Sequence, residues 1–323
     1  MIECENLTKY FGDFLAVDNI NLHVAAGEVL ALLGPNGAGK TTSVRMMTSI
    51  LRPSSGTARI AGYDVVEHPE EVRARVGVLT EQHGLYERMK GLEYLDFFGR
   101  IYHLNQRERE ERALDLMARF DLTFALDKRL GEYSKGMKQK LALVRAMLHD
   151  PAVLLLDEPT SAMDPFSAKL VRDAIIELQR DERTFLITTH NLNEAQMLAD
   201  RIAIIRHGHI VAAGTFDELV RRFAGQPVME MRVNGNAALN GFADDIADTV
   251  TVIEQSADWL RYRTDTPHQT NPQILRRALG VGLEVVALSP VTRTLEDIYL
   301  QVVKEDEQGE RINDDQRASI PAD

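Results

Sequence analysis

Short apolar runs recur along the first 225 residues, and each run ends in polar or glycine residues. The runs are EVLALLG (28–34), RVGVLT (75–80), AVLLLD (152–157), TFLITTH (184–190) and RIAIIRHGHIVAAG (201–214). Nearly continuous apolar runs are typical of strands buried on both faces of a sheet. Stretches with helical spacing, such as TTSVRMMTSIL (41–51), stand between them. This alternation predicts an α/β fold built on a mainly parallel sheet.

Three consecutive stretches between residues 85 and 150 have helical periodicity instead. They are LEYLDFFGRIYHL (92–104), REREERALDLMARFDL (107–122) and MKQKLALVRAML (137–148). The sequence therefore predicts a helical subdomain over about residues 85–150, inserted between two halves of the sheet.

The pattern changes again near FAGQPVMEMRVNG (223–235). Shorter strand-like runs follow, namely VMEMRV (228–233), WLRYRT (259–264) and LEVVAL (283–288). The segment NPQILRRALG predicts a helix with Asn271 as its N-cap, Pro272 at its first position and Gly280 at its end. Together these elements predict a small C-terminal α+β domain over residues 226–303, after a first domain over residues 1–225.

The end of the chain combines one more helix with a charged tail. The helix lies in TRTLEDIYLQVV (292–303), where Thr294 and Asp297 have the spacing of a capping box. From Lys304 onward the chain is charged and almost free of apolar residues. Such a composition buries too little apolar surface to fold, so a disordered acidic tail is predicted over residues 304–323.

Composition and charge narrow the class of protein. The chain has 44% hydrophobic and 27% charged residues, as ordinary globular proteins do. Its formal net charge is −12, and residues 227–323 hold 17 Asp or Glu against nine Lys or Arg. This acidity argues against general nucleic-acid binding, which depends on neutralising phosphates.

The single cysteine and the apolar runs bear on the compartment. Cys4 has no cysteine partner within the chain, which excludes an internal disulfide and indicates a reducing compartment, the cytosol. The apolar runs are far shorter than the ~20 residues that span a bilayer. The N-terminal stretch MIECENLTKYFGD carries acids and no apolar core, so no signal peptide is expected.

The stretch GPNGAGKTT follows a predicted strand and opens a predicted helix. It matches the phosphate-loop pattern G-x-x-x-x-G-K-[ST] in its required context. Glycines let backbone N–H groups turn toward phosphate oxygens, and the helix adds its positive end. Lys40 is expected to reach the β- and γ-phosphates, and the Thr41 hydroxyl to bind Mg²⁺. The nucleotide-binding prediction covers Gly34, Pro35, Asn36, Gly37, Ala38, Gly39, Lys40, Thr41 and Thr42.

Two adjacent acids follow the apolar strand AVLLLD. Asp157 ends the strand, at the sheet edge where open α/β folds bind ligands, and is predicted to hold Mg²⁺ through water. Glu158 points differently and is the candidate base for an attacking water. Adjacent acids alone would be equally consistent with a solvated turn.

Taken in order, these motifs resemble the nucleotide-binding subunits of ABC transporters over about residues 2–222. LLLDEPTSAMDP matches the Asp-Glu-Pro-Thr-Ser run with the D-loop, TEQHGLY the Q-loop, and TTHNLNEA the switch-histidine region. KYFGDFLAVDNI resembles the A-loop. The expected fold is a P-loop NTPase with a helical subdomain and a small C-terminal α+β domain.

YSKGMKQK (133–140) resembles the family's signature loop, usually Leu-Ser-Gly-Gly-Gln. Ser134 and Gly136 match it, whereas Tyr133, Lys135 and Met137 depart from it. These departures, and the C-terminal LEDIYL helix, resemble the branch that exports drugs, antibiotics and sodium. In the family two copies pair head to tail, so Ser134 and Gly136 would close over ATP held by the partner.

The resemblance implies roles for four further residues. Gln82 would contact Mg²⁺ and the attacking water, and His190 would bond the γ-phosphate. Asp164 would reach across the dimer. Phe11 would stack on adenine, with Tyr10 as the adjacent alternative. Each position also has a bland interpretation, a strand-end residue or ordinary core packing.

The sequence thus predicts a cytoplasmic ATPase, peripheral on the inner face of the cell membrane, with ATP and Mg²⁺ as cofactors. Its expected partners are integral-membrane permease subunits and a second copy of itself, with no nucleic acid. The permease is expected near HGLYERMKGLEYL, where Tyr86, Met89 and Leu92 would be exposed or would pack in the core. The alternative is a soluble ABC ATPase that acts on ribosomes or nucleic acid. The paired histidines His207 and His209 indicate a hairpin turn rather than a metal site.

Overall fold

The structure is a computed structural model that describes residues 1–80, 84–161, 163–180, 182–223, 225–234, 239–291 and 293–308. The chain forms two compact units. One comprises Met1–Asp217 with the segment from Lys304, and the other comprises Glu218–Val303. The division falls within helix α8 (Phe216–Phe223) rather than at residue 225, because most of this helix packs within the second unit.

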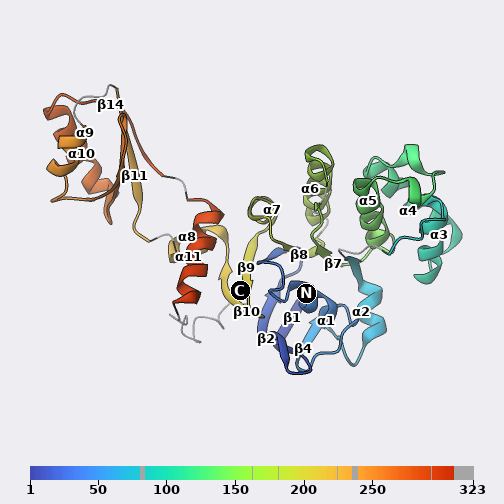
Figure 1. The fold of residues 1–323 in the computed structure, drawn as a ribbon. Coiled ribbons are helices and arrows are strands. Elements are labelled where there is room, and N and C mark those ends of the chain that lie inside the picture. The colour runs from blue at the N-terminus through green and yellow to red at the C-terminus, as the bar shows by residue number, and fades with distance from the viewer. Residues whose placement is uncertain are drawn as a thin grey trace. The chain divides into compact units, whose positions relative to one another are not determined.

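A six-stranded sheet forms the centre of the first unit (Figure 1). Its order is β10-β9-β3-β8-β7-β6, and its strands are parallel except at the β9–β10 pair. The strands are β3 (Val29–Leu33), β6 (Val76–Leu79), β7 (Val153–Asp157), β8 (Thr184–Thr189), β9 (Arg201–Arg206) and β10 (His209–Gly214). Every residue of β3, β7 and β8 is buried, as strands with two covered faces require. The predicted α/β class is confirmed.

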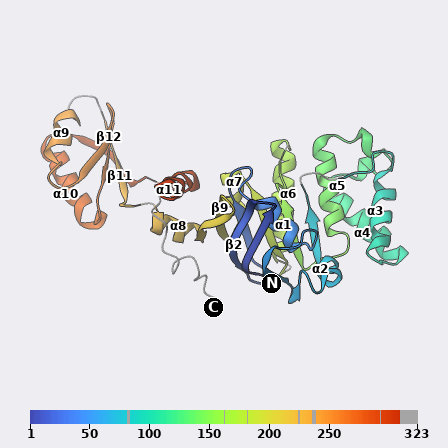
Figure 2. The same cartoon turned by 60° about the horizontal axis from the view of Figure 1, so that its bottom comes forward.

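A second, antiparallel sheet lies beside the first and was not among the predicted elements. Its order is β2-β1-β4-β5. The strands are β1 (Ile2–Phe11), β2 (Phe14–Val24), β4 (Ser55–Ile60) and β5 (Tyr63–Asp64). Helix α1 (Lys40–Met47) contributes to the same buried cluster as strands of both sheets, so it packs between them (Figure 2). Helix α2 (Pro69–Arg75) follows β5.

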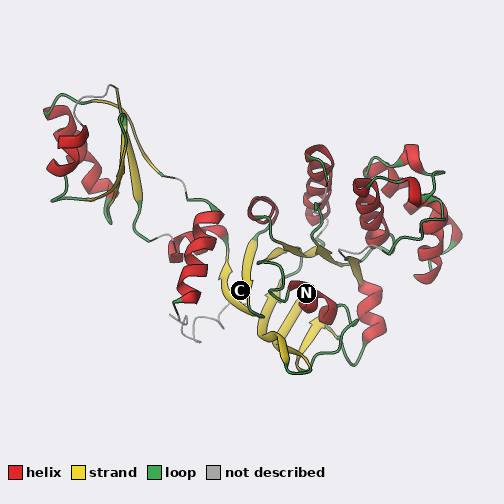
Figure 3. Cartoon of the chain, in the orientation of Figure 1, coloured by secondary structure: helices red, strands yellow, loops and turns green. Residues whose placement is uncertain are grey.

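Three helices make up the predicted helical segment. Figure 3 draws the helices of the chain in red. They are α3 (Gly91–Ile101), α4 (Gln106–Arg119) and α5 (Lys135–Met147), with the short 3₁₀ turns η1 (Thr123–Ala125) and η2 (Leu130–Glu132). The Asn105 side chain caps α4, and the Ser134 side chain caps α5 by accepting from the backbone N–H of Met137. Two further helices, α6 (Pro165–Arg180) and α7 (Leu192–Leu198), follow the strands β7 and β8.

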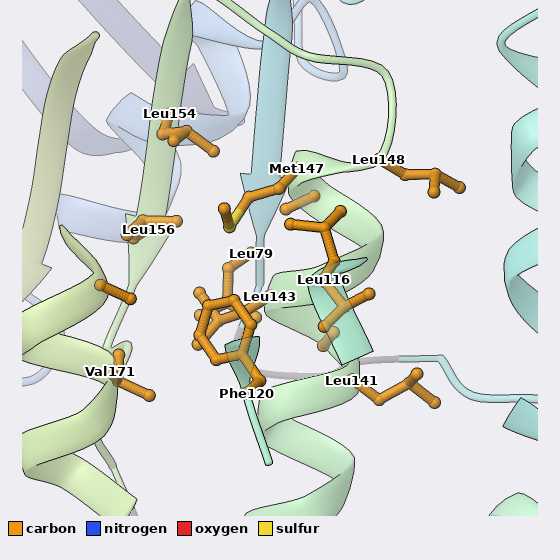
Figure 4. Close-up of a cluster of buried hydrophobic side chains, with 14 of the residues drawn as sticks. Leu79, Leu116, Phe120, Leu141, Leu143, Met147, Leu148, Leu154, Leu156 and Val171 are labelled. Carbon is orange, nitrogen blue, oxygen red and sulfur yellow. The ribbon is translucent and has the colours of Figure 1, made fainter. Parts of the chain in front are cut away.

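A continuous apolar cluster attaches the helical segment to the parallel sheet. Figure 4 shows Leu143 and Met147 of α5 near Leu154 and Leu156 of β7, and Phe120 beside Leu143. These side chains are all less than a tenth exposed. Helix α5 therefore packs on the strand that ends at the two adjacent acids.

The second unit is built on an antiparallel sheet of order β12-β13-β11-β14. Its strands are β11 (Val228–Asn234), β12 (Thr251–Gln255), β13 (Trp259–Arg263) and β14 (Glu284–Pro290). Helices α9 (Leu239–Asp245) and α10 (Pro267–Gly280) lie on one face (Figure 1). Met229, Met231, Leu260 and Tyr262 point toward them and form the core with Ile274.

Two predicted details of this region are wrong. Helix α10 begins at Pro267, not at Pro272, because the earlier proline takes the favoured first position; Pro272 lies inside the helix. The Asn271 side chain instead accepts a hydrogen bond from the Tyr262 hydroxyl at 2.7 Å. Thr294 and Asp297 do form reciprocal capping bonds at the start of the last helix.

The predicted tail begins too early. Helix α11 (Leu295–Glu307) continues past Lys304, and Asp306 pairs with the Arg206 guanidinium at 2.7 Å. The helix therefore gains a partner on strand β9 that composition does not reveal. Residues 309–323 lie outside the described part of the chain. Among the described helices, none has the length and apolar character to cross a membrane.

Close packing between β6 and α5 generates a stability prediction. A Cβ at Gly77 would lie 2.1 Å from the Ala146 carbonyl oxygen and 2.7 Å from a Leu154 methyl group. We expect Gly77→Ala to lower the free energy of unfolding by ~1–3 kcal/mol, because a packed core resists added volume. Denaturant unfolding of the full chain measures this.

The matched control is Gly136→Ala on the same helix α5, where a Cβ meets no atom within 4 Å. This variant should be as stable as the original chain or slightly more stable, since alanine favours helix. Equal losses in the two variants would contradict the packing explanation.

Candidate functional site

The loop between β3 and α1 is shaped by glycines at positions that no other residue fits. A Cβ at Gly34 would lie 2.3 Å from the Ile205 carbonyl oxygen, and one at Gly39 would lie 2.8 Å from the Ala16 carbonyl oxygen. Gly39 also has a φ of 105°. The loop thus turns sharply over strand β9 and delivers its backbone N–H groups to the start of α1, which suits anion binding.

Lys40, the first residue of α1, folds back over this loop. Its Nζ donates to the carbonyl oxygens of Gly34 at 2.6 Å and Pro35 at 3.1 Å, and the side chain is buried. The ammonium is therefore held at the centre of the loop, where a bound phosphate would meet it.

Asp157 lies at the end of β7, and its carboxylate accepts hydrogen bonds from two threonine hydroxyl groups. Its Oδ2 accepts from the Thr41 hydroxyl at 2.9 Å, and its Oδ1 accepts from the Thr188 hydroxyl. Asp157 is 2% exposed. The two residues predicted to hold a metal, Thr41 and Asp157, are thus adjacent, and they offer the oxygen donors that Mg²⁺ prefers. Gln82, the third predicted ligand, lies outside the described residues.

Glu158 has an unusual backbone conformation, with a φ of 51°. Its Oε1 accepts from the backbone N–H of His190 at 3.0 Å and lies 2.7 Å from the ring Nδ1. Since the carboxylate oxygen accepts in this contact, the hydrogen lies on Nδ1 of His190. The structure therefore brings together the predicted base and the predicted switch histidine, which are 32 residues apart in the sequence.

These residues surround one cavity of about 570 Å³. Its lining comprises Phe11, Phe14, Ala16, Asn36, Gly37, Ala38, Gly39, Lys40, Thr41, Thr42, Asp157, Glu158, Ser161 and His190. Phe11 and Phe14 face each other across the β1–β2 turn and are 49% and 65% exposed. Two aromatic side chains at the open side of a phosphate-binding cavity suit a stacked base.

Five described residues of the predicted site do not line this cavity. Gly34 and Pro35 lie beneath the loop, where their carbonyl oxygens accept from Lys40. Among the described lining residues, none comes from Ser134–Gly136, and Asp164 is also absent. Ser134 is exposed. Asp164 is exposed too, and its Oδ1 accepts from the N–H groups of Phe166 and Ser167. The backbone N–H of Ser167 contributes most to lowering the pKa of Asp164.

Some residues at the site lie within the quoted motif stretches but were given no role from the sequence. Phe14 and Ser161 line the cavity. Glu194, 3% exposed, accepts from the hydroxyls of Thr160 at 2.6 Å and Thr189 at 2.7 Å. Burial raises the pKa of Glu194, and these hydroxyl bonds oppose the shift. Glu194 therefore ties the segment after Glu158 to the segment before His190.

A phosphate loop, a buried strand-end aspartate and a base paired with histidine define a nucleotide-hydrolysing site on a P-loop fold. Comparison with known proteins agrees, because the ABC transporter family matches residues 17–161. The chain belongs to the ABC transporter family of ATP-binding proteins, and its enzyme class is ATPase. The resemblance drawn from the motifs is confirmed.

Two relatives illustrate the likeness. The ABC transporter ATP-binding protein NatA of Bacillus subtilis (strain 168) is 42% identical over 205 residues, which are 63% of this chain and 83% of NatA. The daunorubicin resistance ATP-binding protein DrrA2 of Streptomyces coeruleorubidus is 38% identical over 301 residues, which are 93% of this chain and 89% of DrrA2. The likeness to DrrA2 thus extends into the second unit.

Solved structures match the first unit's fold. The ATP-binding subunit of an ABC transporter has a TM-score of 0.65 and 30% identity, covering 69% of this chain and 93% of its own. The dimeric structure of MJ0796, a bacterial ABC transporter cassette, has a TM-score of 0.63 and 25% identity, covering 67% and 98%.

The paired aromatic residues generate a binding prediction. We expect Phe11→Ala and Phe14→Ala each to weaken ATP binding by about 1–3 kcal/mol, or roughly 5- to 150-fold, because each removes a stacking face. Calorimetric titration of the full chain with ATP measures the loss. Phe124→Ala is the control, since Phe124 is 59% exposed and lies outside the cavity. Full affinity in both cavity variants would show that adenine does not stack there.

Proposed function

We propose that this chain is the ATPase subunit of an exporter, and that two copies close head to tail around two MgATP molecules. The observation that carries this is the incomplete cavity. It holds the phosphate loop, Asp157, Glu158 and His190, yet within the described residues it has no contribution from its own signature loop. A second copy would supply Ser134 and Gly136 from outside.

The signature loop is built for such a role. Ser134 and Lys135 are exposed, and a Cβ at Gly136 would meet no atom within 4 Å. The loop opens helix α5, a 13-residue helix whose positive end favours an anion. Backbone approach to a partner's phosphate is therefore unobstructed on this side.

The chemistry is assigned to the chain's own residues. Lys40 binds the β- and γ-phosphates, and Glu158 takes the proton of the attacking water while His190 holds its carboxylate in place. Mg²⁺, held by Thr41 and Asp157 with Gln82 as the predicted third ligand, would neutralise phosphate charge. A positioned general base contributes about 10²–10⁴-fold, or roughly 3–5 kcal/mol of barrier.

Two relatives suggest what the ATPase drives. DrrA2 is named for daunorubicin resistance, and another relative, 33% identical over 301 residues, is the Nod factor export ATP-binding protein I of Rhizobium sp. (strain N33). We extend export to this chain and place it on the inner face of a membrane, against separate permease subunits.

A groove in the first unit suits the permease. It has a volume of about 670 Å³ and is lined by apolar residues of α3 and of the segment after α1, including Ile50, Phe98, Ile101 and Tyr102. Tyr102 stacks on His149 at 3.8 Å, and burial lowers the pKa of His149 to about 4, so its ring is neutral at physiological pH. Glu70 and Arg73 also line the groove, and its apolar side chains fit an apolar segment of a partner.

The three residues expected at the docking surface differ in their exposure. Tyr86 is 51% exposed and makes edge-to-face contacts with Tyr94 and Phe97. Met89 and Leu92 pack against the core, in agreement with their structural alternative. The proposed docking surface therefore consists of Tyr86 and the groove.

The base assignment is tested by Glu158→Gln. We expect this variant to bind ATP, to form a stable dimer, and to lose about 10²–10⁴-fold in turnover, because the amide cannot accept the proton. Phosphate release and light scattering with ATP measure both effects. Normal turnover would remove Glu158 from this role, and failure to dimerise with ATP would contradict the head-to-tail proposal.

The docking surface is tested by Ile101→Glu, which places a charge in the groove at a residue that is 52% exposed. We expect it to abolish co-purification of a multi-span membrane protein from detergent extracts while ATP affinity stays within about 2-fold. The control is Leu114→Glu on α4, 47% exposed and outside the groove. Co-purification of ribosomes or nucleic acid with the unaltered chain, in place of a membrane protein, would favour the soluble alternative.

A further inference from the structure

One buried side chain joins the signature helix to the catalytic base of the same chain. Gln139 lies in α5 and is 5% exposed. Its Nε2 donates to the carbonyl oxygens of Glu158 and Pro159, each at 3.1 Å. Both N–H bonds of one amide group are thus used on the turn that carries the base.

That turn needs external support. The positive φ of Glu158 costs a non-glycine residue about 1–2 kcal/mol. The conformation is held by a bond from the Glu158 N–H to the Thr188 carbonyl at 2.9 Å and by one from the Ser161 N–H to the Glu158 carbonyl at 3.1 Å. Gln139 adds its two bonds to this turn from the helical segment.

Gln139 is also rigidly connected to Ser134. The helix α5 begins immediately after Ser134, its N-cap, so the two residues are about one and a half turns apart, or ~7.5 Å along the axis. Leu143 and Met147 of the same helix pack on β7, which ends at Asp157. A displacement of the Ser134 end of α5 therefore reaches the Glu158 turn through a short, buried path.

We propose that Gln139 is a positioning residue that couples the two ATP sites of the dimer. This inference rests on the proposed head-to-tail arrangement. Ser134 of one chain closes over the partner's ATP, whereas Glu158 of that chain acts on its own ATP. Gln139 then transmits closure at one site to the orientation of the base at the other, so that the two sites hydrolyse cooperatively.

The test is Gln139→Met in the full-length chain. Methionine keeps the length and volume of glutamine but has no N–H group to donate. We expect kcat to fall about 10-fold, less than loss of the base itself, while the affinity for ATP stays within about 2-fold. The Hill coefficient for ATP should fall to about 1, because the sites no longer communicate.

A merely structural role would lower stability without changing cooperativity. Unfolding of Gln139→Met is therefore measured beside its kinetics. If Gln139→Met does not fold, Gln139→Asn replaces it, since this amide is one methylene too short to reach both carbonyl groups. Gln106→Met is the matched control, because Gln106 is exposed on α4 and bonds only within that helix to Glu110.

The outcomes separate this inference from the proposed function. Glu158→Gln should form ATP-dependent dimers. If the double variant with Gln139→Met forms them too, the signature loop still closes over the partner's ATP. With dimers formed, unchanged kcat and an unchanged Hill coefficient in Gln139→Met would overturn the coupling role. Absence of dimers in Glu158→Gln alone would overturn the head-to-tail proposal instead.

Discussion

The register of three parallel strands underlies the whole site. Leu33 of β3 pairs with Thr189 of β8, and Asp157 of β7 pairs with Thr188. The phosphate loop follows Leu33, Glu158 follows Asp157, and His190 follows Thr189. All of them therefore lie at one edge of the sheet. A slip of one residue in any strand would send every side chain to the opposite face. The complete burial of β3, β7 and β8 makes such a slip costly, and the geometry of catalysis depends on that packing.

The same edge combines groups of opposite preference. Lys40, the loop N–H groups and the start of α1 attract phosphate, although the chain as a whole carries a net charge of −12. Asp157 and Glu158 lie in the same cavity and repel phosphate. A polyphosphate that arrives with a divalent cation satisfies both sets of groups, and this is the physical reason to expect MgATP rather than ATP alone.

What the sequence predicts well is local. The phosphate loop, the strand ends at Asp157 and His190, and the three-helix segment each depend on a few consecutive residues. Gln139 and Glu194 escaped prediction because each has a partner far away in the sequence, Glu158 at 19 residues and Thr160 at 34 residues. Phe14 escaped because its place opposite Phe11 depends on how β1 pairs with β2. The first antiparallel sheet escaped for another reason. Shifts of register within β1 interrupt the alternation that would identify a strand with one buried face.

The departures from the usual signature loop follow from where its side chains lie. Tyr133 is buried, its hydroxyl donates to the Ala125 carbonyl at 2.7 Å, and burial raises its pKa to about 12. A Cβ at Gly91 would lie 2.5 Å from that hydroxyl, so α3 and the loop interlock there. Lys135 is exposed, so its side chain takes no part in the packing beneath the loop. Two buried side chains therefore hold the start of α5: Tyr133 bonds to the Ala125 carbonyl, and Gln139 bonds to the Glu158 and Pro159 carbonyls. Ser134 is the exposed end of this rigid element. The signature loop therefore moves only together with α5, and α5 also donates hydrogen bonds to the turn that carries Glu158.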